Sequence, residues 1–282
     1  MLGYAKIFHS HSLQKLSARL SSTYLSSQLA EILHKWPGGR IDLTPSGDIV
    51  RLLLNRPEKS NCLSGEMMFH LGERLKELST FSSCGVLVLE GAGRSLCSGA
   101  DLGLIEQLAT PSLGSEMFRY MSSLLSTIRS SPLVSVARLH GHCLGGATEL
   151  ASACDIRVAH KDSKIGFLQS RMGIVPSWGG APYLESIIGR GAALRVMTTA
   201  PILTATEAKD IGYVDMLYDT EEMFEDFVAS MLKSGPDVCK AQKSMLDAYR
   251  EGNPDAIIRS LWGGQAQKTA IMKQIKAVVN KN

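Results

Sequence analysis

Two glycine-rich segments are the part of this 282-residue chain whose residue types and spacing are suited to chemistry. The first glycine loop, residues 97–102, reads Cys-Ser-Gly-Ala-Asp-Leu, and the second glycine loop, residues 140–149, reads His-Gly-His-Cys-Leu-Gly-Gly-Ala-Thr-Glu. Small residues let a ligand approach the backbone closely, and free N–H groups at the start of a helix attract negative charge. Two converging loops would hold one oxyanion, whereas either loop alone could be a tight strand-to-helix turn.

Each glycine loop follows a short apolar run that predicts a buried strand. These runs are residues 85–90 before the first loop and residues 133–139 before the second. A continuous apolar run of this length is typical of a strand covered on both faces. Because α/β proteins bind ligands beyond the carboxyl ends of such strands, we expect the two loops to meet at one edge of a sheet.

The surrounding pattern predicts one α/β domain built from repeated β–β–α or β–α units. Strands are expected at 41–43, 49–55 and 155–159, and helices at 115–130, at 145–153 and after Ser64, which is expected to cap its helix. Beyond Asp219 the pattern predicts only helices, at about 221–234, 236–250, 254–261 and 265–280. This C-terminal segment is expected to pack on its own core or against a neighbouring subunit.

Composition is that of an ordinary globular protein, with 44% apolar and 20% charged residues. Six cysteines without a CxxC pair argue against a zinc site and a disulfide framework, and favour a reducing compartment. There is no metal-ligand pattern, and no run of 18 apolar residues that would span a membrane.

Residues 1–30 form a basic leader. They contain Lys6, Lys15 and Arg19 and no acid, so the remaining 27 basic residues of the chain match its 27 acidic residues. The body therefore offers no basic surface for nucleic acid. The leader composition fits a mitochondrial transit peptide or a disordered tail of a cytosolic protein, so both the mitochondrial matrix and the cytosol remain open.

Motifs of other enzyme classes are absent from the sequence. There is no GxxxxGK[ST] and no GxGxxG, so neither glycine loop is a nucleotide-binding loop. No GxSxG occurs, and His140 and His142 lack an assignable nucleophile, which argues against a Ser–His–Asp triad.

The order of the motifs resembles the crotonase (enoyl-CoA hydratase/isomerase) superfamily. The resemblance runs from about residue 40 to residue 220 and includes Asn55-Arg56-Pro57, Asn61-Cys62-Leu63, Ser98 to Leu102, His140 to Arg157, and Met172 to Gly180. It implies a ClpP-like spiral of β–β–α units over residues 31–220. It also implies that residues 221–282 form a helical trimerisation segment of a homotrimer or hexamer.

The resemblance also implies where an acyl-CoA substrate would bind. The N–H group of the residue before Gly-x-Asp, here Ser98, pairs in this family with the N–H group of a glycine in the second loop, here Gly146. Together they would hold the thioester oxygen. The adenine pocket would lie around Lys59, Leu96 and Ala100. No cofactor is implied, because coenzyme A is part of the substrate.

Hydratases of this family use two glutamates, and only one is present here. The first falls on Glu149, which either acts at the acyl group or is a core carboxylate bound by backbone. The second falls on Gln169, and glutamine cannot exchange a proton as a carboxylate does. The acyl pocket is expected to be lined by Leu144, Ile174, Val175 and Trp178, with Gln169 also binding the substrate. Trp178 could instead only pack or, with Ser177, cap a helix.

Decarboxylation does not need the second glutamate. The C–CO2⁻ bond of a malonyl thioester already holds the electrons of the enolate, so no base is required to start the reaction. Segments 36–43, 172–180 and 261–264 resemble the ethylmalonyl-CoA decarboxylase branch of the family. We therefore expect a decarboxylase of short branched malonyl-CoA thioesters. The alternatives are an enoyl-CoA hydratase that uses Glu149 and a non-catalytic homologue that binds acyl-CoA or RNA; the neutral body disfavours RNA.

Overall fold

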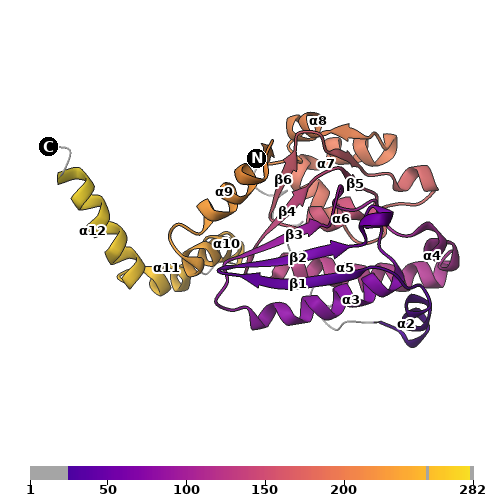
Figure 1. Ribbon diagram of the computed structural model, residues 1–282, viewed down its shortest axis with the longest axis horizontal. Helices are drawn as coiled ribbons and strands as arrows, with labels where there is room; N and C mark the ends of the chain where they lie inside the picture. Colours follow the sequence, from indigo (N-terminus) through magenta and orange to yellow (C-terminus); the bar gives the residue numbers. More distant parts are fainter. Residues whose placement is uncertain (1–24, 252–253, 280–282) are drawn as a thin grey trace, which may run out of the picture.

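The computed structural model describes residues 25–251 and 254–279 and has a six-stranded sheet at its centre (Figure 1). β1 and β2 form an antiparallel hairpin, and every later neighbour in this sheet pairs in parallel. The strand order is β1 (Arg40–Ser46), β2 (Ile49–Asn55), β3 (Val86–Gly91), β4 (Val134–Leu139), β6 (Ile156–His160) and β9 (Met216–Tyr218). A smaller sheet contains β5 (His142–Leu144), β7 (Lys164–Gly166) and β8 (Leu203–Thr204).

Helices separate most of these strands, as the sequence pattern predicts. The α-helices of the body are α2 (Ser27–His34), α3 (Gly65–Lys76), α4 (Leu102–Gln107), α5 (Pro111–Ser130), α6 (Gly146–Ala153), α7 (Ala181–Thr199) and α8 (Ala205–Asp210). Three short 3₁₀ turns are η1 (Pro57–Lys59), η2 (Glu77–Thr80) and η3 (Gln169–Met172). Ser64 caps α3 by accepting the N–H of Met67 at 3.1 Å, so the predicted cap is confirmed.

The sheet is covered on both faces, and successive side chains of β3 point alternately into the two clusters that cover it. Leu87 and Leu89 face the large core shared with α3, α5 and α6. Val86 and Val88 point the other way, into a smaller cluster closed by Phe224 and other residues of the C-terminal helices. A strand buried on both faces needs a continuous apolar run, which is why this segment could be recognised from sequence.

The predicted boundary of the leader at residue 31 is too late. α2 begins at Ser27, and the side chains of Leu29 and Leu33 are fully buried against the body. Ser26 caps this helix by accepting the N–H of Leu29 at 3.1 Å. The folded part therefore includes residues 25–30, while residues 1–24 lie outside the described residues.

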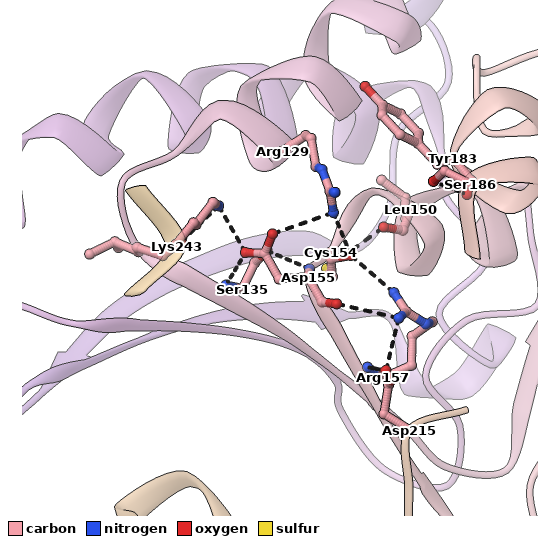
Figure 2. Close-up of polar contacts among 11 residues, drawn as sticks. Arg129, Ser135, Leu150, Cys154, Asp155, Arg157, Tyr183, Ser186, Asp215 and Lys243 are labelled. Carbon is pink, nitrogen blue, oxygen red and sulfur yellow. Dashed lines mark hydrogen bonds and ion pairs between the residues drawn. The ribbon is translucent and has the colours of Figure 1, made fainter. Parts of the chain in front are cut away.

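The four predicted C-terminal helices are present as α9 (Glu221–Met231), α10 (Pro236–Glu251), α11 (Asp255–Leu261) and α12 (Gln265–Val279). α9 and α10 pack on the body, and Lys243 of α10 reaches Asp155 at 2.8 Å (Figure 2). α11 and α12 run away from the body (yellow in Figure 1), and Trp262 between them is 75% exposed. The helices therefore divide into a docked pair and an extended pair.

All six cysteines are free thiols, so no disulfide forms. In the described ranges, no helix combines the length and the apolar character needed to cross a membrane.

Candidate active site

The two glycine loops meet at the carboxyl end of the parallel strands, as predicted. Cys97 and Cys143 form a parallel bridge, in which the Cys97 N–H donates to His142 at 3.0 Å and Leu144 N–H donates to Cys97 at 3.1 Å. A Cβ atom added at Gly99 would lie 3.7 Å from the nitrogen of Gly146. The two loops are thus in direct contact around Gly99.

The peptide that joins Gly99 to Ala100 presents an unused N–H group. The carbonyl of Gly99 accepts the N–H of Leu63 at 2.8 Å. In a trans peptide the N–H group points opposite to the carbonyl, so the Ala100 N–H is directed away from Leu63. Within the described part of the chain no backbone or side-chain acceptor takes this N–H. Gly99 itself has φ of +106°, which favours glycine at this position.

Ser98 does not supply the free donor that the sequence analysis assigned to it. Its N–H donates to the carbonyl of Ser60 at 3.0 Å and is already satisfied. The donor of the first loop is therefore displaced to Ala100, which the sequence analysis had placed in the adenine pocket. Ala100 has the free N–H because this loop is hydrogen-bonded to distant residues: Ser60 accepts the Ser98 N–H, and Leu63 donates to the Gly99 carbonyl.

Gly146 supplies the second N–H group. It is the first residue of α6, and among the described residues its N–H has no acceptor. The positive end of the helix dipole adds to its attraction for an anion. A Cβ atom at this position would overlap the ring of Trp178, so only glycine leaves room for that ring.

Glu149 lies one turn further along α6 and is 1% exposed. Its carboxylate accepts four N–H groups: Trp178 N at 2.9 Å, Gly180 N at 2.8 Å, Ser177 N at 3.2 Å and Gln169 Nε2 at 3.0 Å. Burial raises the pKa of Glu149 to about 7, because the hydrogen bonds from Gly180, Trp178, Gln169 and Ser177 offset only part of the desolvation.

Gln169 lies beside Glu149, as the comparison of motifs implied. Its side chain is buried, with 6% exposed, and the amide nitrogen is used by Glu149. The amide oxygen has no hydrogen-bond partner in the described structure. The side chain next to Glu149, for which the resemblance implied the place of the second hydratase glutamate, is thus a neutral amide that Glu149 orients.

Trp178 packs over the start of α6 and does not cap a helix. It is 2% exposed, and its carbonyl accepts Ser122 Oγ of α5 at 3.2 Å. The residue at the cap position of α7 is Gly180, so the capping alternative for Trp178 and Ser177 is wrong. The ring is a wall of the site next to Gly146.

The remaining predicted binding residues lie around the first glycine loop. Lys59 is exposed in η1, and its carbonyl lies 3.5 Å from Ser98 Oγ. Leu96 is buried, and its N–H donates to His140 at 2.8 Å. Leu144 is partly buried, with its carbonyl 3.1 Å from a Cβ atom built on Gly99. The places of Lys59 and Leu96 in the adenine pocket and of Leu144 in the acyl pocket stay predictions. Two other residues predicted for the acyl pocket, Ile174 and Val175, are 46% and 74% exposed.

A network that the sequence analysis missed holds the other side of this loop. Asp101 caps α4 and accepts Gly103 N at 3.1 Å, Arg56 Nη1 at 2.9 Å and the indole of Trp36. Burial acts to raise the pKa of Asp101, but the hydrogen bonds from Arg56 and Trp36 outweigh it and the pKa is lowered. In the sequence, only the motifs that contain Arg56 and Trp36 could have indicated that these residues bind Asp101. Asp101 is therefore a structural residue of this loop.

Comparison with known proteins places this architecture in a family. The family model described as Enoyl-CoA hydratase/isomerase matches residues 45–262. The chain is 36% identical over 276 aligned positions to ethylmalonyl-CoA decarboxylase of Mus musculus, covering 91% of this chain and 84% of that one. It is 33% identical over 288 aligned positions to ethylmalonyl-CoA decarboxylase of Homo sapiens, covering 97% and 93%.

A solved structure agrees in fold. Enoyl-CoA hydratase from Thermoplasma volcanium superposes with a TM-score of 0.75 at 26% identity, covering 83% of this chain and 96% of that one. The shared α/β architecture and the family match over residues 45–262 lead to one conclusion: the chain belongs to the enoyl-CoA hydratase/isomerase (crotonase) family.

Proposed function

We propose that this protein is a carboxy-lyase that removes CO2 from short branched malonyl-CoA thioesters. Ethylmalonyl-CoA is the preferred substrate, methylmalonyl-CoA is a weaker one, and the reaction serves as metabolite repair. The observation that carries the proposal is the pair Glu149 and Gln169, in which the carboxylate accepts four N–H groups and its neighbour is an amide. The relatives named ethylmalonyl-CoA decarboxylase support the same reaction.

The proposed reaction needs an electron sink more than it needs a base. The electrons of the breaking C–CO2⁻ bond move to the thioester carbonyl, CO2 leaves, and an enolate forms. Its oxygen would accept the N–H groups of Ala100 and Gly146, which are unused in the protein alone. A proton added at the α-carbon then gives the acyl-CoA product. Loss of one donor of this kind typically costs about 3–4 kcal/mol of transition-state stabilisation.

Hydration of an enoyl-CoA is the competing reaction. It requires a group that activates water and a group that protonates the α-carbon. An ionised carboxylate has about four acceptor sites, and Glu149 uses four for N–H groups. Gln169 cannot replace the second acid. These contacts favour decarboxylation over hydration.

The test is a product assay on the purified protein. Incubation with ethylmalonyl-CoA is expected to give butyryl-CoA and CO2, detected by mass spectrometry and by CO2 capture, and methylmalonyl-CoA is expected to react more slowly. Heat-inactivated protein measures the uncatalysed background. Failure to form butyryl-CoA above that background would overturn the proposal.

We also propose that the chain assembles as a homotrimer or hexamer through its C-terminal helices. Apolar side chains on α11, on α12 and between them are exposed, including Ile258 at 43%, Ile275 at 57% and the intervening Trp262 at 75%. Exposed apolar residues grouped on an extended segment are typical of a surface that a partner covers. Light scattering on the full chain should give a mass three or six times 30.5 kDa, and a monomeric mass would contradict it.

A further inference from the structure

The segment that follows η3 closes the site, and Glu149 is its main attachment. This Trp178 segment, residues 173–180, has exposed apolar residues at its start and buried ones at its end. Three of the four N–H groups on Glu149 come from its last residues, Ser177, Trp178 and Gly180. Gly180 also lies directly on Glu149, because a Cβ atom added there would be 2.5 Å from Glu149 Cβ. One side chain therefore holds the segment on α6.

A second, weaker attachment lies on α5. Ser122 Oγ donates to the carbonyl of Trp178 at 3.2 Å. Gly179 fits against the same side chain, since a Cβ atom at Gly179 would lie 2.5 Å from Ser122 Oγ. The Trp178 segment is thus held between α5 and α6, with Glu149 on one side and Ser122 on the other.

The Trp178 segment places its tryptophan ring against Gly146. The Trp178 ring occupies the space that a side chain at Gly146 would need. The N–H of Gly146 is unused and begins α6, the same helix that carries Glu149 one turn later. One turn of α6 therefore links the four hydrogen bonds of Glu149 to the Gly146 N–H. The same hydrogen bonds also fix the position of the Trp178 ring.

The hydrogen bonds of Glu149 also limit what it can do chemically. A group that exchanges a proton with a substrate needs a free lone pair or a free proton near the substrate. Oε1 accepts from Ser177 and Gln169, and Oε2 accepts from Trp178 and Gly180. In the ionised side chain, both oxygens are saturated by groups of the protein itself, so no lone pair is left to take a proton from water or substrate.

We propose that Glu149 is a positioning residue, which holds the Trp178 segment against Gly146 and thereby aligns the Gly146 N–H for the thioester oxygen. It takes no part in proton transfer. This inference rests on the proposed decarboxylase function for its kinetic consequences, but its structural consequences can be measured without any substrate.

The first test is Glu149→Gln. The amide keeps the size of the side chain, but its NH2 group faces N–H donors that the carboxylate accepted. The Trp178 segment should loosen, so backbone hydrogen exchange of residues 177–180 should rise. A Trp262→Phe background removes the tryptophan that is 75% exposed and leaves Trp36 and Trp178. Because Trp36 is common to both proteins, acrylamide should quench the fluorescence of Glu149→Gln in this background more strongly than that of its parent.

The kinetic result should separate positioning from substrate binding. A misplacement of about 1 Å costs roughly 100-fold in rate, and an interaction made only in the transition state changes kcat and leaves KM unchanged. Glu149→Gln should therefore lower kcat for ethylmalonyl-CoA by about 100-fold and change KM by less than about threefold.

Two further variants keep the test decisive. Ser122→Ala leaves Glu149 intact and removes the contact on α5, so the same changes in exchange, quenching and kcat should appear at smaller size. Asp155→Asn makes the same carboxylate-to-amide change at the other end of α6, and it should leave exchange at 177–180 unaltered.

The outcomes are distinct. If Glu149→Gln lowers kcat while exchange and quenching stay at the wild-type level, Glu149 acts on the substrate and the inference is wrong. Full activity of Glu149→Gln would also overturn it. If the wild-type protein decarboxylates nothing, the proposed function fails, whereas unchanged exchange at 177–180 in Glu149→Gln would refute the positioning role independently.

Discussion

Glu149 and Asp155 lie at opposite ends of α6 and are bound in opposite ways. Glu149, in the first turn, accepts four neutral N–H groups and has no cationic partner in the described structure. Asp155, just past the last turn, accepts the N–H and hydroxyl of Ser135, both at 2.8 Å, and two cations, Lys243 at 2.8 Å and Arg129 at 3.4 Å (Figure 2).

The difference follows from position on the helix. The positive end of the helix dipole and the free N–H groups stabilise an anion at the first turn, whereas a carboxylate beyond the last turn meets the negative end and needs cations. A cation beside Glu149 would compete for the enolate that Gly146 is proposed to bind. Neutral donors fix the Trp178 segment without that competition. At Asp155, Lys243 fastens α10 to the start of β6, and Arg129 fastens α5 to the same place.

The largest expected effect is at the Glu149 end, from Gly146→Ala. The added methyl group would overlap the Trp178 ring and displace either the ring or the N–H. We expect kcat for ethylmalonyl-CoA to fall by about 100- to 1,000-fold. Gly114→Ala is the matched control, because a Cβ atom there meets nothing within 4 Å. Equal activity of both variants would show that the Gly146 N–H is not part of the reaction.

The comparison also predicts a pH dependence of stability from Glu149. Burial raises its pKa from 4.5 to about 7, so between these pH values the folded protein binds the proton more tightly than the unfolded chain does. The stability that Glu149 contributes is full below pH 4.5 and decreases as the pH rises to about 7, by about 3 kcal/mol.

Urea unfolding of the wild type and Glu149→Gln at pH 5 and pH 8 measures this dependence. The free energy of unfolding of the wild type relative to the variant should be lower at pH 8 than at pH 5. The same difference at both pH values would contradict the raised pKa.

A smaller effect is expected at the Asp155 end, from Lys243→Met. Lys243 is 10% exposed and donates to Asp155 and to the carbonyl of Leu133 at 3.0 Å. Because Arg129 and Ser135 continue to bind Asp155, the variant should lose about 2 kcal/mol of unfolding free energy, below the usual cost of breaking a buried pair. Lys276→Met on exposed α12 should change it by less than about 0.5 kcal/mol. Equal losses would show that the ion pair does not anchor α10.

Local patterns were enough to predict most elements of this fold. The apolar run at 85–90 and the cap at Ser64 are set by neighbouring residues, and both were found in place. α2 was missed because its composition matches a leader, and only contact with the body buries Leu29 and Leu33.

The candidate site depended more on contacts between distant residues. That the two glycine loops meet could be predicted from strand order, and Glu149 and Gln169 could be paired from motif spacing. The free N–H of Ala100 could not be predicted, because it depends on the hydrogen bonds that Ser60 and Leu63 make with this loop. The four donors on Glu149 were likewise invisible, since three belong to a segment whose path is set by packing on α5 and α6.

The central claim is that this site stabilises an enolate with backbone N–H groups and leaves no carboxylate to activate water. The most direct measurement compares kcat/KM for decarboxylation of ethylmalonyl-CoA with kcat/KM for hydration of crotonyl-CoA on one preparation of the wild-type protein. We expect decarboxylation to exceed hydration by at least about 100-fold, the contribution of acid–base catalysis that the site lacks. Hydration equal to or faster than decarboxylation would contradict the account.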